Sequence, residues 1–367
     1  MKFSKGLGWF FISLISLCMA SVSWADDDDR DKDKGKDDHN HLAVNKVEGS
    51  LSVMVLGSGG PVATAAGRAS AGYLIFLDGK PRILMDVGGG TYQRLAESGV
   101  NIRDLDTILL SHLHIDHTGD LSSVIKTIYF HNNLARGMNP AIPGRTASIN
   151  IYGPDSTSFP NGPGGKFPET DVLQYPATTD YIDDHYSVAK GGVERYLNAF
   201  APAISQGASQ FSYTANDLSS NWMMAGNIET VLDEGDLKIT AIAVNHGPVP
   251  AVGFRIDYKG HSVAYSGDTS SKTNNMVTLS EGADLLIYDT AITETLPTNP
   301  VFHLLHTEPR RLGEVAAAAK VKKLVLSHIT PVTETRIKEV KAVVRENYLG
   351  AIKVAKDLKV YNLADDD

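Results

Sequence analysis

The chain has 367 residues, 42% of them hydrophobic, which is enough for one large core or two small ones. Its 33 Gly and 16 Pro suit a loop-rich α/β enzyme and exclude a fibrous or coiled-coil protein. The formal net charge of −9 predicts a poor non-specific partner for nucleic acid.

Residues 1–25 have the pattern of an export signal. Two lysines precede an apolar run at 7–20 that is too short to span a bilayer comfortably, and small residues flank Trp24 before the predicted cleavage point. Cleavage would remove Cys18, the only cysteine, and leave neither a disulfide nor a thiolate ligand. We expect a periplasmic or secreted protein with no stable membrane span; an uncleaved anchor is the alternative.

Residues 26–45 are expected to form a disordered acidic leader. The stretch 26–42 contains eight Asp and almost nothing apolar, so it cannot build a core. Weak cation binding by this Asp run, or by His39 and His41, is the alternative. The folded domain is expected over residues 46–367.

Apolar patterning predicts an alternation of strands and helices along this domain. An Asp-Gly pair at 78–79 indicates a hairpin turn between two of the strands. In chain order, the expected elements are strands at 51–56, 73–77 and 82–86, a helix at 91–98, strands at 107–111, 237–244, 251–257, 262–265 and 284–288, a helix at 309–320, a strand at 323–327 and a helix at 335–348.

A long segment at 131–235 interrupts this alternation. It contains a Pro- and Gly-rich run at 160–165 and scattered aromatic residues. We expect an insertion that lies over the site and shapes a pocket for an apolar or aromatic group of a small substrate. A structural subdomain without substrate contact is the alternative.

The stretch from Ser111 to Asp120 carries most of the predicted chemistry. An apolar strand leads directly into His112, His114, Asp116 and His117. Neutral imidazole and carboxylate groups are ligands that zinc, iron and manganese accept, and packing does not call for so many polar groups at a strand end. The pattern therefore predicts a metal site rather than a surface cluster of histidines.

Four later residues, His246, Asp268, His306 and His328, also follow apolar runs. Alone, each is more often a structural polar residue. Together with the first stretch, they supply enough ligands for two adjacent metal ions.

These motifs resemble those of the metallo-β-lactamase superfamily, in which His-x-His-x-Asp-His is the signature. The branch they resemble is that of ribonuclease Z and its relatives, which include class III arylsulfatases and some phosphodiesterases. The matching features are an early Gly-Ser-Gly-Gly-Pro, a Ser-Gly-Asp-Thr, a His-Thr-Glu and a Ser-His-Ile-Thr-Pro, spread over residues 51–332.

The resemblance implies an α/β fold of the four-layer αββα sandwich type, with two divalent metal ions at the sheet edges. Zinc is the expected metal, although iron or manganese also suits ligands without thiolate. Of the implied ligands, His112, His114 and His246 would hold one ion, Asp116, His117 and His328 would hold the other, and Asp268 would bridge them.

Such a metal pair lowers the pKa of a shared water, which can then attack phosphorus, sulfur or a carbonyl carbon. Asp116 and His306 are the expected catalytic residues, and His306 would protonate the leaving group. His303 is the alternative to His306. Asp86 and Asp289 are expected to orient site residues from behind.

The chain departs from ribonuclease Z in two places. Only 21 residues separate His246 from Asp268, which leaves no room for the tRNA-gripping arm, and the family's His-Glu-Ala-Thr is replaced by the residues at 288–291. We therefore expect a hydrolase of a small anionic ester, a phosphodiester or aryl sulfate, with nucleic acid disfavoured as a partner and a homodimer allowed. Lactone or β-lactam ring opening, and an iron-binding redox or non-catalytic protein, are the alternatives.

Overall fold

The computed structural model describes residues 47–139, 141, 147–156, 175–187, 189 and 211–363. All of them belong to one compact unit, His41–Asp367. The predicted export signal at 1–25 and acidic leader at 26–45 lie outside the described residues. Within the described part of the chain, no helix combines the length and the apolar character needed to cross a bilayer.

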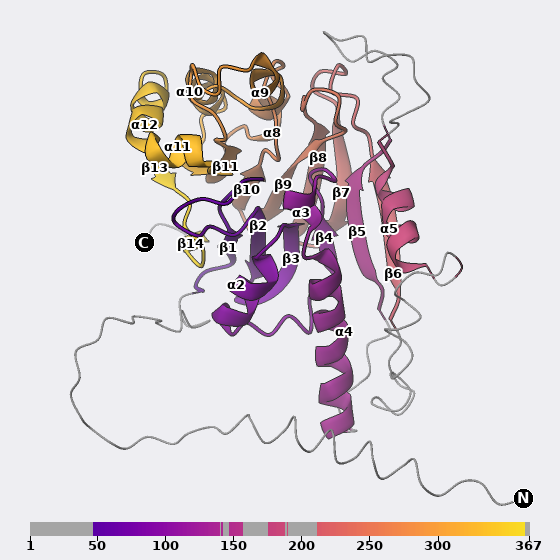
Figure 1. Cartoon of the computed structure of the whole chain (residues 1–367). Coiled ribbons are helices and arrows are strands. Elements are labelled where there is room, and N and C mark those ends of the chain that lie inside the picture. The colour runs from indigo at the N-terminus through magenta and orange to yellow at the C-terminus, as the bar shows by residue number, and fades with distance from the viewer. Residues whose placement is uncertain are drawn as a thin grey trace, which may run out of the picture. The chain divides into compact units, whose positions relative to one another are not determined.

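The first of two mixed sheets is built from the amino-terminal half of the domain and one late strand (Figure 1). Its seven strands run in the order β14-β1-β2-β3-β4-β5-β6. Their bounds are β1 Leu51–Gly57, β2 Gly72–Leu77, β3 Lys80–Val87, β4 Thr107–Leu109, β5 Ile149–Pro154, β6 Tyr213–Leu218 and β14 Val360–Leu363.

The second sheet also has seven strands, in the order β13-β12-β11-β10-β9-β8-β7. Strands β10 to β13 are mutually parallel, and β7, β8 and β9 form an antiparallel meander beside them. The bounds are β7 Ile228–Glu234, β8 Leu237–Ala243, β9 Val252–Tyr258, β10 His261–Tyr265, β11 Leu285–Asp289, β12 Lys323–Ser327 and β13 Ala351–Val354.

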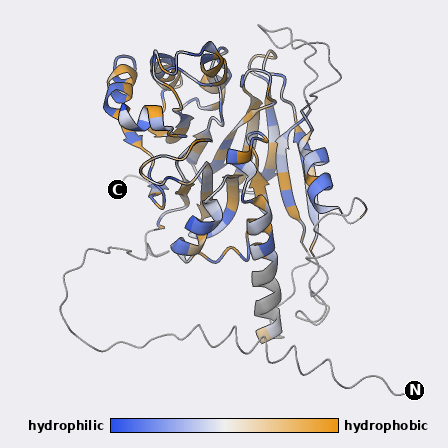
Figure 2. Cartoon of the chain, viewed as in Figure 1, coloured by the Kyte–Doolittle hydropathy of each residue, from blue (hydrophilic) through white to orange (hydrophobic). Residues whose placement is uncertain are grey.

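Helices cover the outer face of each sheet, and the apolar clusters show why. Side chains alternate along a strand, so Val53 and Val55 of β1 point into the cluster between the sheets, whereas Met54 and Leu56 point toward the helices. Figure 2 shows this apolar character along the strands. The helices are α2 Thr91–Ser98, α3 Ile115–Thr118, α4 Leu121–Met138, α5 Thr178–Tyr186, α8 Asn275–Leu279, α9 Pro300–Leu305, α10 Pro309–Ala318, α11 Pro331–Thr335 and α12 Ile337–Arg345.

The four layers follow from three separate apolar clusters. One lies between the sheets, a second joins the first sheet to α2, α4 and α5, and a third joins the second sheet to α8, α10 and α12. This is the αββα arrangement that the motifs predicted. The Asp78-Gly79 hairpin is also confirmed, with φ angles of 48° and 77° that suit a tight turn between twisted strands.

The segment 131–235 differs from the expectation in its described part. Strands β5 and β6 extend the first sheet and β7 forms the edge of the second, so these stretches belong to the sandwich instead of lying over the site. These strands are short and contain many polar residues, and β6 and β7 have almost no fully buried residues, so no apolar run marks them in the sequence. The Pro- and Gly-rich run at 160–165 lies outside the described residues.

Candidate metal centre

The site lies where strands of both sheets end. Strands β8, β10, β11 and β12 run in the same direction, so the loops that follow them meet at one edge of the second sheet. Strands β3 and β4 are parallel in the first sheet and also end there. Residues spread from position 86 to position 328 are thereby brought together.

The His-x-His-x-Asp-His stretch turns its polar side chains to one side. His114 precedes the short helix α3, and the His117 amide donates to the His114 carbonyl at 2.9 Å. This turn leaves Ile115 80% exposed while Asp116 and His117 are buried. The helical turn thus points the side chain of Ile115 away from the ligand-type side chains.

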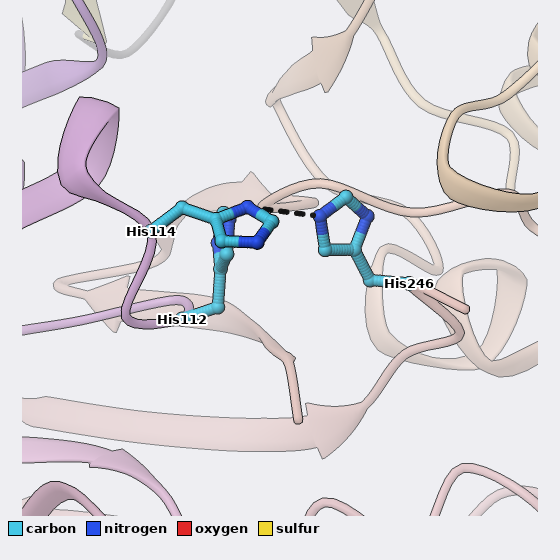
Figure 3. Close-up of side chains that lie close together, drawn as sticks. All are labelled: His112, His114 and His246. Atoms are coloured by element: carbon cyan, nitrogen blue, oxygen red, sulfur yellow. Dashed lines mark hydrogen bonds between the residues drawn. The ribbon is translucent and has the colours of Figure 1, made fainter. Parts of the chain in front are cut away.

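His112, His114 and His246 form the first ligand group (Figure 3). The Nε2 atom of His112 lies 3.0 Å from Nδ1 of His114, and Nε2 of His246 lies 3.4 Å from the same Nδ1. Figure 3 shows the rings facing one another, although they come from loops far apart in the sequence. Three imidazole nitrogens converging on one point fit a metal ion.

Asp116, His117, Asp268 and His328 form the second group, and all four are buried. The Nε2 atom of His328 lies 3.1 Å from Asp116 Oδ2 and 3.3 Å from His117 Nε2. Asp268 lies between the two groups. Its Oδ2 is 3.9 Å from both His112 Nε2 and His246 Nε2 and 3.2 Å from His328 Nε2, so this carboxylate lies within 4 Å of nitrogen atoms of both groups.

The residues fit metal ions on two further observations. Asp268 Oδ1 is buried and has no hydrogen-bond partner among the described residues; it lies 3.4 Å from His117 Nε2 without hydrogen-bonding geometry. A buried carboxylate oxygen without a donor is costly unless a cation compensates it. The donor set consists of nitrogen and oxygen atoms only, which suits zinc, iron or manganese.

Burial and charge divide the histidines into two kinds. Burial lowers the pKa of His112 well below its usual value and that of His246 to about 3, so both are neutral, as metal ligands must be. Burial also opposes protonation of His117 and His328, but Asp268 and neighbouring carboxylates outweigh it; the pKa of His117 is raised well above its usual value and that of His328 to about 10. The second group therefore attracts positive charge, which a divalent cation would supply in place of these protons.

Asp86 holds the first loop from behind. It accepts hydrogen bonds from the Ser111 amide and hydroxyl at 2.7 Å each, contacts His117 Nδ1 at 2.7 Å, and accepts from the Tyr265 hydroxyl at 2.6 Å. On the other side, His246 Nδ1 is held by the Leu305 carbonyl at 2.8 Å. These contacts fix which ring nitrogen is free to bind a metal ion.

Asp289 connects a ligand histidine with His306. Its Oδ2 lies 2.8 Å from His306 Nδ1, and its Oδ1 lies 3.4 Å from His328 Nδ1. His306 is buried and directly follows helix α9, a helix that the sequence pattern missed. His303, the alternative catalytic histidine, contacts Glu308 and the Pro297 carbonyl instead.

Sequence reasoning missed two supporting groups. Tyr265 directly precedes the Ser-Gly-Asp-Thr motif and was predicted only as part of a strand. A tyrosine at a strand end beside a ligand loop could have indicated a hydrogen bond to the site. The Leu305 carbonyl gave no signal, because backbone carbonyls carry no sequence pattern.

Comparison with known proteins agrees with this geometry. One family model, described as a metallo-beta-lactamase superfamily, matches residues 66–132, and a second, described as a beta-lactamase superfamily domain, matches residues 184–329. The chain is 26% identical to a ribonuclease Z of Mycobacterium avium over 318 residues, which are 84% of this chain and 96% of the relative. It is 24% identical to a ribonuclease Z of Archaeoglobus fulgidus over 282 residues, 76% of this chain and 87% of the relative.

Solved structures show the same fold. The short form of human tRNase Z aligns with a TM-score of 0.57 and 20% identity over 84% of this chain and 98% of that one. The metallo-β-lactamase fold protein YhfI from Bacillus subtilis aligns with a TM-score of 0.56 and 20% identity over 85% and 98% of the two chains.

The fold and the paired ligand groups define a metal-dependent hydrolase. The chain belongs to the metallo-β-lactamase superfamily, with relatives in its ribonuclease Z branch.

One expectation is corrected by this comparison. A small-molecule substrate was expected and nucleic acid was disfavoured, but curated relatives that match over most of their length are ribonucleases. Net charge misled here because it averages over the surface and says nothing about one face.

Proposed function

We propose that this protein is a metal-dependent phosphodiesterase that hydrolyses RNA. The observation that carries the proposal is the convergence of seven ligand-type side chains into two groups that share Asp268. The ribonuclease Z relatives support a phosphodiester in RNA as the bond that is cleaved.

In this proposal, His112, His114 and His246 hold one divalent ion, Asp116, His117 and His328 hold the other, and Asp268 lies between them. Zinc fits these ligands, as do iron and manganese. When bound, such a pair lowers the pKa of a water molecule and withdraws charge from the phosphoryl oxygens.

The chain's own residues supply the proton transfer. Water attacks phosphorus, the bond from phosphorus to the leaving oxygen breaks, and that oxygen needs a proton. Burial lowers the pKa of His306, but Asp289 outweighs it, so the pKa is raised above its usual value. His306 can therefore carry a proton at neutral pH, and Asp289, at 2.8 Å, fixes its ring.

We propose broad RNA degradation rather than tRNA maturation, and the missing arm supports this. Strands β9 and β10 and their tight turn occupy the stretch between His246 and Asp268, where the family's RNA-gripping arm would be. The predicted export signal would also place the reaction outside the cytoplasm, away from tRNA precursors. We therefore propose an exported ribonuclease with little selectivity for tRNA.

The test uses the metal-loaded protein and a panel of substrates: an unstructured RNA oligonucleotide, a tRNA precursor with a 3′ trailer, a bis-aryl phosphodiester, an aryl sulfate and a lactone. We expect cleavage of both RNAs at similar rates, slower cleavage of the bis-aryl phosphodiester, and loss of all three activities in His114→Ala. Metal analysis of the same samples should give two ions per chain for the parent. Turnover of the sulfate or lactone without RNA cleavage would overturn the proposal.

A further inference from the structure

Charge is distributed unevenly along this acidic chain. Residues 309–363 carry twelve Lys and Arg against five Asp and Glu, whereas the rest of the chain carries twenty-two against thirty-eight. This carboxyl-terminal part includes α10, α11, α12, β12, β13 and β14. Figure 1 shows α11, α12 and β13 next to one another. A local positive field can therefore exist on a protein whose net charge is negative.

Helix α12 presents its cations on one side. Lys338, Lys341 and Arg345 are spaced three and four residues apart, which places them in a row on one face of an α-helix. Val340 and Val344 are fully buried and form the core-facing side, which the row borders. Lys338 and Arg345 are exposed, and Lys341 is partly exposed. The row therefore faces solvent.

The strand that follows adds a further exposed lysine. Strand β13 is the edge of the second sheet, and Lys353 on it is exposed. Lys356 and Lys359, in the connection to β14, are exposed as well. An edge lysine also discourages pairing with another chain, but that role would need only Lys353 and not the helical row.

The nearby acidic groups are largely neutralised. Glu346 pairs with Arg310 at 2.6 Å, and Asp357 accepts from Arg94 at 2.9 Å. Among the described residues, Lys338, Lys341 and Lys353 form no ion pair. Glu339 is the remaining exposed acid on α12, so the face keeps a net positive charge.

A short chain of contacts leads from this face to the metal centre. Asp357 Oδ1 accepts from the Ser58 amide at 3.0 Å and from its hydroxyl at 2.7 Å. Two residues further, Gly60 lies so close to His328 that an added Cβ would be 2.7 Å from its ring. Lys356 and Lys359 therefore flank Asp357, which holds Ser58, two residues before the glycine that packs against His328.

We propose that Lys338, Lys341, Arg345, Lys353, Lys356 and Lys359, here called the basic face, bind the phosphate backbone of the RNA substrate. The inference rests on the proposed function and gives it a binding surface. Lysine and arginine side chains neutralise phosphates without reading sequence, which suits a ribonuclease of low selectivity. The basic face would replace the missing arm as the holding element.

The test compares two variants that each lose three positive charges. One replaces Lys338, Lys341 and Lys353 by Gln. The control replaces Lys80, Lys238 and Lys259 by Gln. These lysines are exposed, and each lies at the end of a strand that is far from the metal centre. Binding of a fluorescent RNA is measured against salt concentration in the metal-loaded His306→Asn background, and hydrolysis of a bis-aryl phosphodiester is measured without that substitution.

We expect the basic-face variant to bind RNA at least tenfold more weakly, with a salt slope reduced by about 2 to 3. Its hydrolysis of the small phosphodiester should equal that of the parent and of the control variant. If both variants lose the same RNA affinity, or if neither loses any, the proposal that the basic face binds RNA is wrong, while the proposed ribonuclease activity still stands. If the parent does not bind RNA but hydrolyses the small phosphodiester, both the basic face and the RNA substrate are wrong.

Discussion

The hydroxyl of Tyr265 donates a 2.6 Å hydrogen bond to Asp86 and so joins the two sheets at the metal centre. Tyr265 ends β10 of the second sheet, and Asp86 lies in β3 of the first. Asp86 in turn contacts His117 at 2.7 Å. The orientation of a ligand from the first half of the domain therefore depends on a hydroxyl from the second half.

We predict that Tyr265→Phe weakens metal binding without unfolding the protein. Removal of the hydroxyl leaves Asp86 with one donor fewer and His117 less firmly oriented, and changes of this kind cost about 10- to 100-fold in metal affinity. Chelator competition measures the effect. Tyr186→Phe is the matched control, because Tyr186 is equally buried and bonds Ser122 away from the site. Equal metal affinities for the two variants would contradict the prediction.

His306 and His303 should differ sharply when replaced by Asn. His306 contacts Asp289 inside the site, whereas His303, on the partly exposed helix α9, contacts Glu308. We expect His306→Asn to lower kcat by about 10²- to 10⁴-fold with metal content unchanged, and His303→Asn to stay within a few-fold of the parent. Steady-state kinetics measure kcat for both variants, and metal analysis measures their metal content. A larger loss in the His303 variant would assign the proton donor to that residue instead.

Gly60→Ala should disturb the second ligand group. A Cβ at this position would lie 2.7 Å from the His328 ring, which Asp116 and neighbouring groups already hold in place. We expect lower metal occupancy and a free energy of unfolding reduced by about 1–3 kcal/mol. Gly89→Ala is the control, since a Cβ there meets no atom within 4 Å. The measurements are metal content and denaturant unfolding, and equal results for both variants would refute the steric argument.

Asp284 should make stability depend on pH in the acid range. Burial raises its pKa, but hydrogen bonds from Lys322 and the Ser262 amide, at 2.6 and 2.7 Å, outweigh burial and lower it. Because the folded pKa is below the unfolded one, the stabilisation is complete above the unfolded value and is lost as pH falls through the folded value.

Asp284→Asn should therefore reduce the free energy of unfolding by about 1–2 kcal/mol at neutral pH and by progressively less toward pH 3. Urea unfolding at a series of pH values measures it. Asp233→Asn, at an exposed and loosely paired carboxylate, corrects for general effects of acid. A difference between these variants that stays constant with pH would contradict the prediction.

Much of the site could be predicted from local sequence. The stretch from His112 to His117 contains four ligand-type groups at a strand end, and no packing requirement explains them. His246, Asp268 and His328 each follow a strongly apolar strand, whose burial is easily predicted from composition. The short, half-exposed strands β5, β6 and β7 were missed, because their alternation is weak and neighbouring strands, not local preference, hold them in place.

The sequence by itself determined the kinds of ligand atoms and the strands that carry them, because hydrophobic periodicity and side-chain chemistry are local properties; the sandwich fold was implied by the resemblance of its motifs to those of the metallo-β-lactamase superfamily. Only the tertiary structure decided that His306 contacts Asp289 while His303 does not, that Tyr265 supports His117 through Asp86, and that α12 lies next to β13. Each of these facts is a distance between residues far apart in the chain or a direction in which a side chain points. Such distances exist only after the two sheets have packed, so no local pattern can encode them individually.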